Sequence, residues 1–455
     1  MKKGYILLMV LMISNLIAQV PNLTLSQIYY GSAREFPNAR ALALGGSGLA
    51  GGLAVHGAML NPALLATNEK QIQGSVSGYI YYLEEDRAYP YYDNFGGFVD
   101  FGNYVYNSNT YGDFTISTIV KLPVLAAYNF NLGLGINSLL DYNYDYLEEV
   151  RSTSFGDALL GYNRINSDGI WREINLSVGF NLMPPLAFGL KLGFITGSVS
   201  QQYEIFPVDV AQNNNGQKQM TETELNNTPI NVNLGGYYRL NPQFSIGASI
   251  KLPLTVKTEN TFQIMTNLSY PGGGLLPPDQ LVPGLEGSAG PYDSTAQSSY
   301  VRKLEYPLTL AVGLEYRFTN ILEARINADF AYTFWSDFKD DLNSDLIFSD
   351  TYVFKVGLEH IFFDQLPFRV GFQYQPLKEN RDYTRVVLTA GVGLIFDQFE
   401  LDLSGGLENM TTNQLDLFDD GLYPPLVSRT DVVDRVQTNY LYGMIEFRIG
   451  LDNVY

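Results

Sequence analysis

Few side chains in this sequence could carry out covalent chemistry. The 455 residues include no cysteine and only two histidines, His56 and His360. Without cysteine the chain has no disulfide framework and no thiolate metal site. A hydrolase would need a serine held within hydrogen-bond reach of a histidine, and the pair Glu359-His360 has no obvious nucleophile beside it. We therefore expect a protein that is not an enzyme.

Acidic residues gather in two segments, 337–350 and 416–420. Carboxylate oxygens are good ligands for divalent cations, but neither segment has the spacing of an EF-hand loop. Solvated loop charge is the simpler interpretation, so we predict no metal site and no cofactor. The formal net charge of −19 argues against nucleic acid as a partner, because phosphates require a basic surface.

Two groups of residues are better suited to bind a ligand. Segment 263–302 carries leucines that would be costly to expose on a loop unless they cover or bind something. Arg317 and Arg325 lie on the polar face of predicted strands, where a guanidinium could pair with a ligand carboxylate. The alternatives are that the leucines fold the loop back over the barrel mouth and that the arginines pair with other inward-facing charges or with the hatch. The leucines of this candidate ligand-binding group are Leu275, Leu276, Leu281 and Leu285.

The elements that would position these residues are strands. In 304–318 every second residue is apolar, while the residues between them are polar or small. Since successive strand side chains point to opposite faces, such a strand has one apolar face and one polar face. The pattern recurs fourteen times, at roughly 71–83, 113–130, 132–147, 171–183, 186–202, 228–240, 243–262, 303–318, 321–336, 351–363, 366–376, 383–396, 398–409 and 436–450.

The connections between these strands alternate between short turns and long loops. A soluble sandwich also alternates, but its strands rarely reach 15 residues. Long strands with one apolar face, joined by two kinds of connection, are typical of outer-membrane barrels, whose short turns face the periplasm. No stretch after the N-terminus is apolar enough for a membrane-spanning helix. We predict an all-β fold, a 14-stranded antiparallel transmembrane β-barrel over residues 71–455, acting as a monomer in outer-membrane lipid.

The N-terminal residues divide into two further parts. Residues 1–18 have two lysines, an apolar run and a small residue at Ala18, which is the layout of a secretory signal peptide. Residues 19–70 include a segment, 39–66, that is rich in Gly, Ala and Leu. So apolar a segment would be poorly solvated as a free arm, and fourteen strands enclose more space than their own side chains fill. We predict that residues 19–70 form a hatch inside the lumen.

Several motifs resemble those of the FadL family of outer-membrane transporters for hydrophobic compounds. Gly45 and Gly46 followed by Asn61-Pro62-Ala63 resemble the N-terminal hatch of that family. Segments 307–338 and 366–374 resemble its paired long strands and its Arg-x-Gly-x-x-Tyr strand. The resemblance covers nearly the whole chain after the signal peptide, although this chain ends on Tyr455 and not on phenylalanine.

This resemblance implies a function. It implies passive diffusion of long-chain fatty acids or other hydrophobic small molecules through a plugged barrel with a lateral exit, at the outer membrane of a bacterial cell. The hatch and gate residues would be Gly45, Gly46, Asn61, Pro62 and Ala63. The alternative is a barrel that serves as a partner in protein secretion or surface attachment, docking proteins on its tyrosine-rich loops. Whether the strand containing Gly133 and Gly135 bends to form the exit is left open by the sequence.

Overall fold

The structure is a computed structural model that describes residues 22–33, 36–93, 95–123, 128–152, 158–207, 216–268, 293–318, 324–423, 426 and 433–452, with only the backbone described at 266–268 and 293–296. The predicted signal peptide lies outside the described residues. So do Leu275, Leu276, Leu281 and Leu285.

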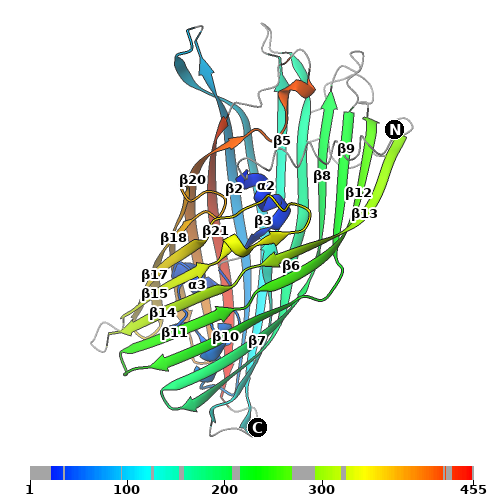
Figure 1. The fold of residues 1–455 in the computed structure, drawn as a ribbon. Coiled ribbons are helices and arrows are strands. Elements are labelled where there is room, and N and C mark those ends of the chain that lie inside the picture. The colour runs from blue at the N-terminus through cyan, green and yellow to red at the C-terminus, as the bar shows by residue number, and fades with distance from the viewer. Residues whose placement is uncertain are drawn as a thin grey trace.

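Fourteen strands form one closed antiparallel ring, which confirms the predicted fold class (Figure 1). The ring closes because the first barrel strand, β2, pairs with the last, β21, from Ile72↔Leu451 to Ala88↔Arg435. In ring order the strands are β2 (Ile72–Tyr92), β3 (Phe98–Lys121), β4 (Asn131–Asp141), β6 (Leu159–Met183), β7 (Leu186–Thr196), β10 (Ile230–Arg239), β11 (Phe244–Lys251), β14 (Thr309–Arg317), β15 (Ala324–Thr333), β17 (Thr351–Phe362), β18 (Leu366–Pro376), β19 (Thr384–Ile395), β20 (Phe399–Leu415) and β21 (Val433–Leu451).

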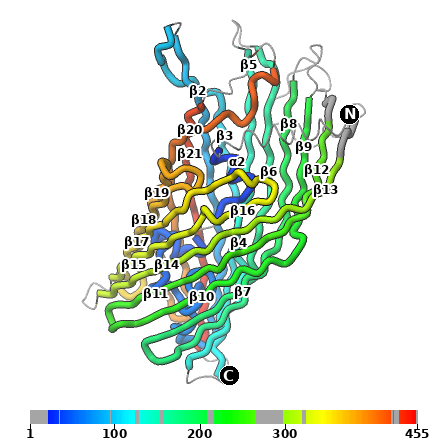
Figure 2. The backbone as a smooth tube through the Cα atoms, in the orientation of Figure 1, coloured from blue at the N-terminus to red at the C-terminus, as the bar shows by residue number. Residues whose placement is uncertain are grey.

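A second sheet extends part of the wall beyond the ring at the long-loop end. It shares β6 with the ring, and β6 there pairs with β5 and β8. Figures 1 and 2 show these strands rising above the shorter strands β14, β15, β17 and β18. The remaining strands of this sheet are β5 (Tyr144–Arg151), β8 (Ser198–Pro207), β9 (Gly216–Leu225), β12 (Leu254–Leu268), β13 (Asp293–Tyr306) and β16 (Lys339–Asp340).

These extensions correct several predicted loops. Segment 84–112, predicted as a loop, is mostly a hairpin in which β2 and β3 stay paired as far as Tyr92↔Phe98. Parts of 148–170, 203–227, 263–302 and 410–435 are strand as well. The physical reason is that the outward face turns polar here, as at Glu84 and Asp86, while the backbone ladder continues. An apolar face marks where a strand meets lipid and not where the strand ends.

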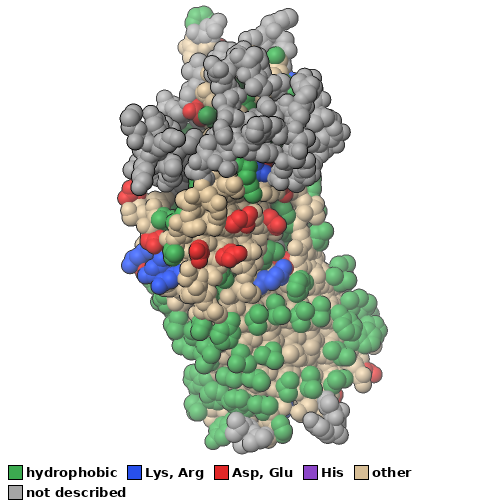
Figure 3. Space-filling view, turned by 90° about the vertical axis from the view of Figure 1, so that its right-hand side faces the viewer, with side chains coloured by type: hydrophobic (Ala, Val, Ile, Leu, Met, Phe, Trp, Pro, Cys, Tyr) green, Lys and Arg blue, Asp and Glu red, His purple; other side chains and the backbone are tan. Residues whose placement is uncertain are grey.

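The outward face of the ring is apolar at the short-turn end. On β14, Leu310, Val312 and Leu314 are about two-fifths exposed, while Gly313 and Glu315, which point to the other face, are buried. Figure 3 shows the resulting band of apolar side chains, with acidic and basic side chains above it. Such a band is what a barrel presents to lipid. Among the described residues, no helix has the length and apolar character needed to cross a membrane.

The N-terminal segment lies inside the ring, as predicted. Asn22, Asn38 and Asn61 each cap a helix in it by accepting a backbone N–H. Most of its alanines and leucines are buried, including Ala39, Leu42 and Leu64 at 0–1% exposure. The elements are α2 (Leu23–Tyr30), β1 (Ser32–Ala33), α3 (Ala39–Ala43), η1 (Ala54–His56) and η2 (Pro62–Thr67); two short helices elsewhere are η7 (Trp335–Asp337) and η8 (Asp420–Leu422).

Candidate functional site

The hatch packs directly on glycines of the barrel wall. A Cβ at Gly189 of β7 would lie 2.2 Å from the Pro62 carbonyl carbon, and one at Gly371 of β18 would lie 2.0 Å from the Gly45 nitrogen. Any side chain at these positions would overlap the hatch backbone. Inward-facing glycines therefore let the plug touch the wall with no gap between them.

The predicted motif Asn61-Pro62-Ala63 holds the hatch together and anchors it to β10. The Asn61 Nδ2 donates to the backbone oxygens of Leu49, at 2.8 Å, and of Gly236, at 3.0 Å. Its Oδ1 accepts the Ala63 N–H at 3.1 Å and so caps η2. The predicted Gly45 and Gly46 have φ angles of 66° and 78°, which favour glycine, and form the turn after α3.

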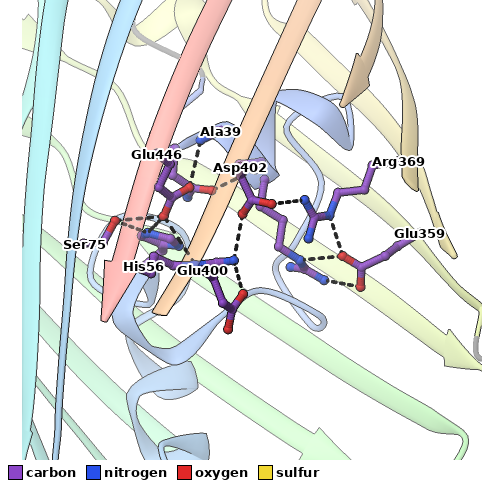
Figure 4. A network of polar contacts seen from close by, with 12 residues as sticks. Ala39, His56, Ser75, Glu359, Arg369, Glu400, Asp402 and Glu446 are labelled. Atoms are coloured by element: carbon purple, nitrogen blue, oxygen red, sulfur yellow. Dashed lines mark hydrogen bonds and ion pairs between the residues drawn. The ribbon is translucent and has the colours of Figure 1, made fainter. Parts of the chain in front are cut away.

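Buried charges attach the hatch to the opposite part of the wall. The Arg40 guanidinium on α3 donates to both oxygens of Glu359 on β17, at 2.9 and 3.0 Å. Glu359 also accepts from Arg369, which donates in turn to Asp402. Figure 4 shows this chain of contacts, which reaches β17, β18 and, past β19, β20. A buried charge that loses its partner is strongly destabilising, so the network holds α3 in place.

The same network includes one of the two histidines. His56 Nε2 lies 2.7 Å from Glu446 Oε1 on β21, and Glu446 Oε2 accepts the Ala39 N–H at 3.1 Å (Figure 4). Ser75 Oγ lies 3.1 Å from the same Nε2 atom. Because serine and carboxylate share one ring nitrogen, His56 is not placed as a base between nucleophile and acid. Its contacts attach η1 to β2 and β21.

A cavity of about 360 Å³ lies in the lumen against the hatch residues Gly46, Leu49 and Leu60. Its walls are apolar on one side, with Trp171 and Val256 among the residues that line it. On another side they are polar: Lys251, Thr309, Thr333 and Thr351 lie in one register row of adjacent strands. The cavity therefore suits a mainly apolar guest with a small polar part.

A second cavity of about 180 Å³ adjoins the first and shares Ala33, Phe36, Tyr79, Trp335 and Gln375 with it. The helix α2 contributes Leu23 and Gln27 to its wall. Four lumenal tyrosines supply much of the rest, and their rings pack with centroids 5.8–6.2 Å apart. These tyrosines are Tyr79, Tyr81, Tyr440 and Tyr442.

The wall is interrupted beside the first cavity. Strands β3 and β4 pair from Lys121↔Asn131 to Ile116↔Ile136. Beyond that point the described part of β3 continues to Phe98 without backbone pairing to β4 or β5. At the same level β4 has a bulge opposite β6, between Ser138 and Leu140. Asp113, Thr115 and Asn137, which flank the interruption, also line the cavity. We call this interruption the β3–β4 gap.

The N-terminal segment takes the place that β3 leaves empty. Strand β1 pairs with β4 through Ser32↔Asp141 and Ala33↔Leu140. On its other side β4 pairs with β6 through Leu140↔Trp171. The upper end of β4 therefore has its backbone partner inside the lumen. A short strand of two residues is a weak attachment compared with a full ladder.

Side chains replace the missing backbone ladder farther along. Asn109 Nδ2 donates to the Asp145 carbonyl at 2.8 Å, and the Asp145 N–H donates to Tyr111 Oη at 2.8 Å. Asn107 Oδ1 accepts the Leu147 N–H at 3.1 Å. The seam between β3 and β5 thus depends on the side chains of three β3 residues.

The structure separates the two predicted ligand-binding arginines from the cavity. Arg317 and Arg325 face inward but lie at the short-turn rim and do not line either cavity. The motif 61–63 packs on β7 and β10, away from the β3–β4 gap. Sequence reasoning missed Asp113 and Trp171 as cavity residues, whereas the alternation of side chains already indicated that Lys251 faces inward. The only sequence feature that could have identified the two missed residues was their position on, or adjacent to, the polar face of a predicted strand.

A buried acidic group lies in the extension beyond the apolar band. Glu148 of β5, Asp416 and Asp420 offer carboxylate oxygens within 4.8 Å of one another. Burial raises the pKa of Glu148 to about 7, against the hydrogen bond from Asn163, which lowers it. Burial, together with Glu148 and Asp434, raises the pKa of Asp416 well above its usual range. Burial therefore favours the protonated form of both Glu148 and Asp416.

Fold and site together define a class of protein: a 14-stranded membrane barrel, plugged by its N-terminal segment, with a lumenal cavity beside an interrupted seam. Solved structures share this fold. A FadL homologue of Pseudomonas aeruginosa matches with a TM-score of 0.63 and 14% identity, over 92% of this chain and 99% of that one.

Two channels for aromatic compounds match nearly as well. The monoaromatic hydrocarbon channel CymD has a TM-score of 0.57 at 16% identity, over 92% of this chain and 98% of that one. The toluene transporter TodX of P. putida has a TM-score of 0.56 at 16% identity, over 92% and 99%. No family model and no curated protein matches the chain. The fold is therefore that of the FadL-type channels.

Proposed function

We propose that the protein carries hydrophobic small molecules, long-chain fatty acids among them, across a bacterial outer membrane by passive diffusion. The ligand enters from the long-loop end, occupies the lumenal cavities and leaves sideways through the β3–β4 gap into the lipid. The observation that carries this proposal is that the larger cavity reaches Asp113, Thr115 and Asn137 at the gap. An apolar ligand gains little from a water-filled pore, whereas a lateral exit delivers it to lipid.

The proteins with this fold support the proposal, since two of them are described as a toluene transporter and a monoaromatic hydrocarbon channel. The cavity fits either an aliphatic or an aromatic guest of moderate size. The hatch would remain in place during transport because glycine contacts and buried charges hold it to the wall.

Crosslinking tests the route. The natural chain has no cysteine, so Thr115→Cys with Asn137→Cys creates one pair across the gap. In proteoliposomes we expect uptake of a labelled long-chain fatty acid and of toluene by the unmodified chain. A reducible bifunctional maleimide should block uptake in the double variant, and reduction should restore it.

The matched control is Thr261→Cys with Ser299→Cys. These residues are register partners in the β12–β13 ladder and line neither cavity. Crosslinking this pair should leave uptake unchanged. Uptake that survives the crosslink across the gap would reject the lateral route, and no uptake of either compound by the unmodified chain would reject transport.

A second candidate function, partnership in protein secretion or surface attachment, is favoured by one observation. The β2–β3 hairpin projects beyond the rest of the described wall (Figures 1 and 2) and exposes aromatic side chains at its tip, with Phe95 98% exposed. Aromatic residues are enriched in protein interfaces. Deleting residues 89–101 should leave ligand uptake intact and abolish recovery of a surface protein if this function holds.

A further inference from the structure

Two arginines face each other at the rim opposite the long loops. Arg317 of β14 and Arg325 of β15 are register partners, and both project inward. Their side chains are 38% and 30% exposed. Like charges directly opposite one another on neighbouring strands destabilise the pair unless something neutralises them. The contacts around each guanidinium show how incomplete that neutralisation is.

Each arginine has one carboxylate near it, and neither carboxylate is well placed. Arg317 Nε lies 2.9 Å from Glu315 Oε2 but is not aligned to donate a hydrogen bond. Arg325 Nε lies 3.7 Å from Glu359 Oε1. Glu359 already accepts three hydrogen bonds of 2.6–3.0 Å from Arg40 and Arg369. Within the described chain, neither rim guanidinium donates a hydrogen bond.

A buried amide beside the arginines also lacks a partner. Asn327 lies two residues from Arg325 on the same face of β15 and is 0% exposed. Neither its Oδ1 nor its Nδ2 has a hydrogen-bond partner among the described residues. Buried polar groups are nearly always paired. An unpaired buried amide beside two guanidinium groups that donate no hydrogen bond therefore indicates a place where a polar ligand binds.

We propose that Arg317 and Arg325 form a binding site for a small oxyanion, a carboxylate or a phosphate group, at the periplasmic mouth of the barrel. Two planar guanidinium groups present paired donors that match such an anion, and the Asn327 Nδ2 supplies a further donor. Glu315 opposes binding. Glu359 is already paired with Arg40 and Arg369, so it does little to neutralise the two rim arginines, and the rim keeps a net positive charge.

The site is separate from the proposed lateral route. The strands that carry the arginines, β14 and β15, lie far from the β3–β4 gap in both directions around the ring. Four strands, β6, β7, β10 and β11, separate β4 from β14, and six strands separate β15 from β3. The hatch residue Gly51 lies against Asn327, and neither the two arginines nor Asn327 lines either cavity. The anion would therefore reach the arginines from the periplasm, and this site does not depend on uptake through the gap.

Isothermal titration of the purified full chain in detergent, at constant ionic strength, tests the site with inorganic phosphate and with acetate. We expect saturable binding of at least one of them, and the stronger of the two identifies the group. Arg317→Gln and Arg325→Gln should each weaken it at least tenfold. The control Arg435→Gln removes an arginine that packs over Phe101 at the other end of the barrel and should change nothing.

Two results would overturn the proposal: no binding of either anion to the unmodified chain, or equal binding to the doubly substituted one. If the glutamine variants do not fold, Arg317→Lys and Arg325→Lys keep the charge and lose the paired donors, and they should weaken binding by a smaller factor. Loss of ligand uptake leaves these titrations unaffected, so failure of this site and failure of the proposed transport are distinguishable.

Discussion

Asp113 of β3 and Arg172 of β6 form an ion pair across the upper end of β4, with Asp113 Oδ1 2.6 Å from Arg172 Nη1. The two strands are not neighbours in the ring, since β4 lies between them. Ser138 of β4 also donates to Asp113, and the Arg172 guanidinium lies 4.6 Å from the Phe114 ring centroid. The β3–β4 gap is thus bridged by side chains where a barrel wall normally has a backbone ladder.

Weakening this bridge should ease passage. Asp113→Asn keeps the size of the side chain and removes the charge, and the partly exposed pair contributes on the order of 1 kcal/mol. We expect uptake in proteoliposomes to become a few times faster. The barrel should remain folded, as judged by the difference in gel mobility between heated and unheated samples. Arg151→Gln breaks the exposed pair with Glu149 on the outer surface and should leave uptake unchanged. Slower or equal uptake by Asp113→Asn would contradict a gating role for the pair.

Neighbouring glycines on β10 test the packing of the hatch. A Cβ at Gly235 would lie 2.2 Å from Asn61 Oδ1, whereas one at Gly236 meets nothing within 4 Å. Gly235→Val should therefore displace the hatch and raise the conductance of the barrel in planar bilayers. Gly236→Val should match the unmodified chain. Equal conductance of the two variants would show that the hatch does not depend on this contact.

Much of the fold follows from the alternation of side chains. Within the run 304–318, predicted to have one lipid-facing side, β14 has that side, because a strand exposed to lipid on one face alternates with period two. The start of the run departs from the prediction, since Leu304 belongs to β13 of the second sheet and is buried. The hatch followed from the Gly- and Ala-rich segment 39–66. The polar extensions were missed because beyond the lipid nothing requires an apolar outer face.

The site was less predictable for a different reason. Arg317 and Arg325 were recognised as inward-facing, but their height in the barrel depends on register and on the turns, which alternation does not encode. Asp113 and Arg172 meet only because β4 is bulged. The resemblance of Asn61-Pro62-Ala63 to a known motif identified a hatch anchor, whereas its contacts with β10 required the three-dimensional structure.

Breaking the Arg40–Glu359 pair should loosen the hatch. Arg40→Met removes the charge that neutralises Glu359 and leaves a buried carboxylate with Arg369 and the more distant Arg325. Removing one partner of a buried ion pair costs roughly 3–5 kcal/mol. Amide exchange in α3 should therefore quicken by two orders of magnitude or more. Lys70→Met removes an exposed pair with Asp452 and should leave exchange in α3 as it was.

The carboxyl groups of the extension should make its stability depend on pH. Because burial raises the pKa of Glu148 to about 7, the folded extension binds more protons than the unfolded chain between pH 4.5 and 7. Its stability is therefore highest below the ordinary pKa of glutamate and falls as pH rises to 7, by up to about 3 kcal/mol. Amide exchange of β5, corrected for intrinsic rates, should be slower at pH 5 than at pH 8. Glu148→Gln should flatten this dependence, while Glu149→Gln, an exposed neighbour paired with Arg151, should keep it. If Glu148→Gln kept the pH dependence of exchange and Glu149→Gln flattened it, Glu148 would be ionised in the folded state.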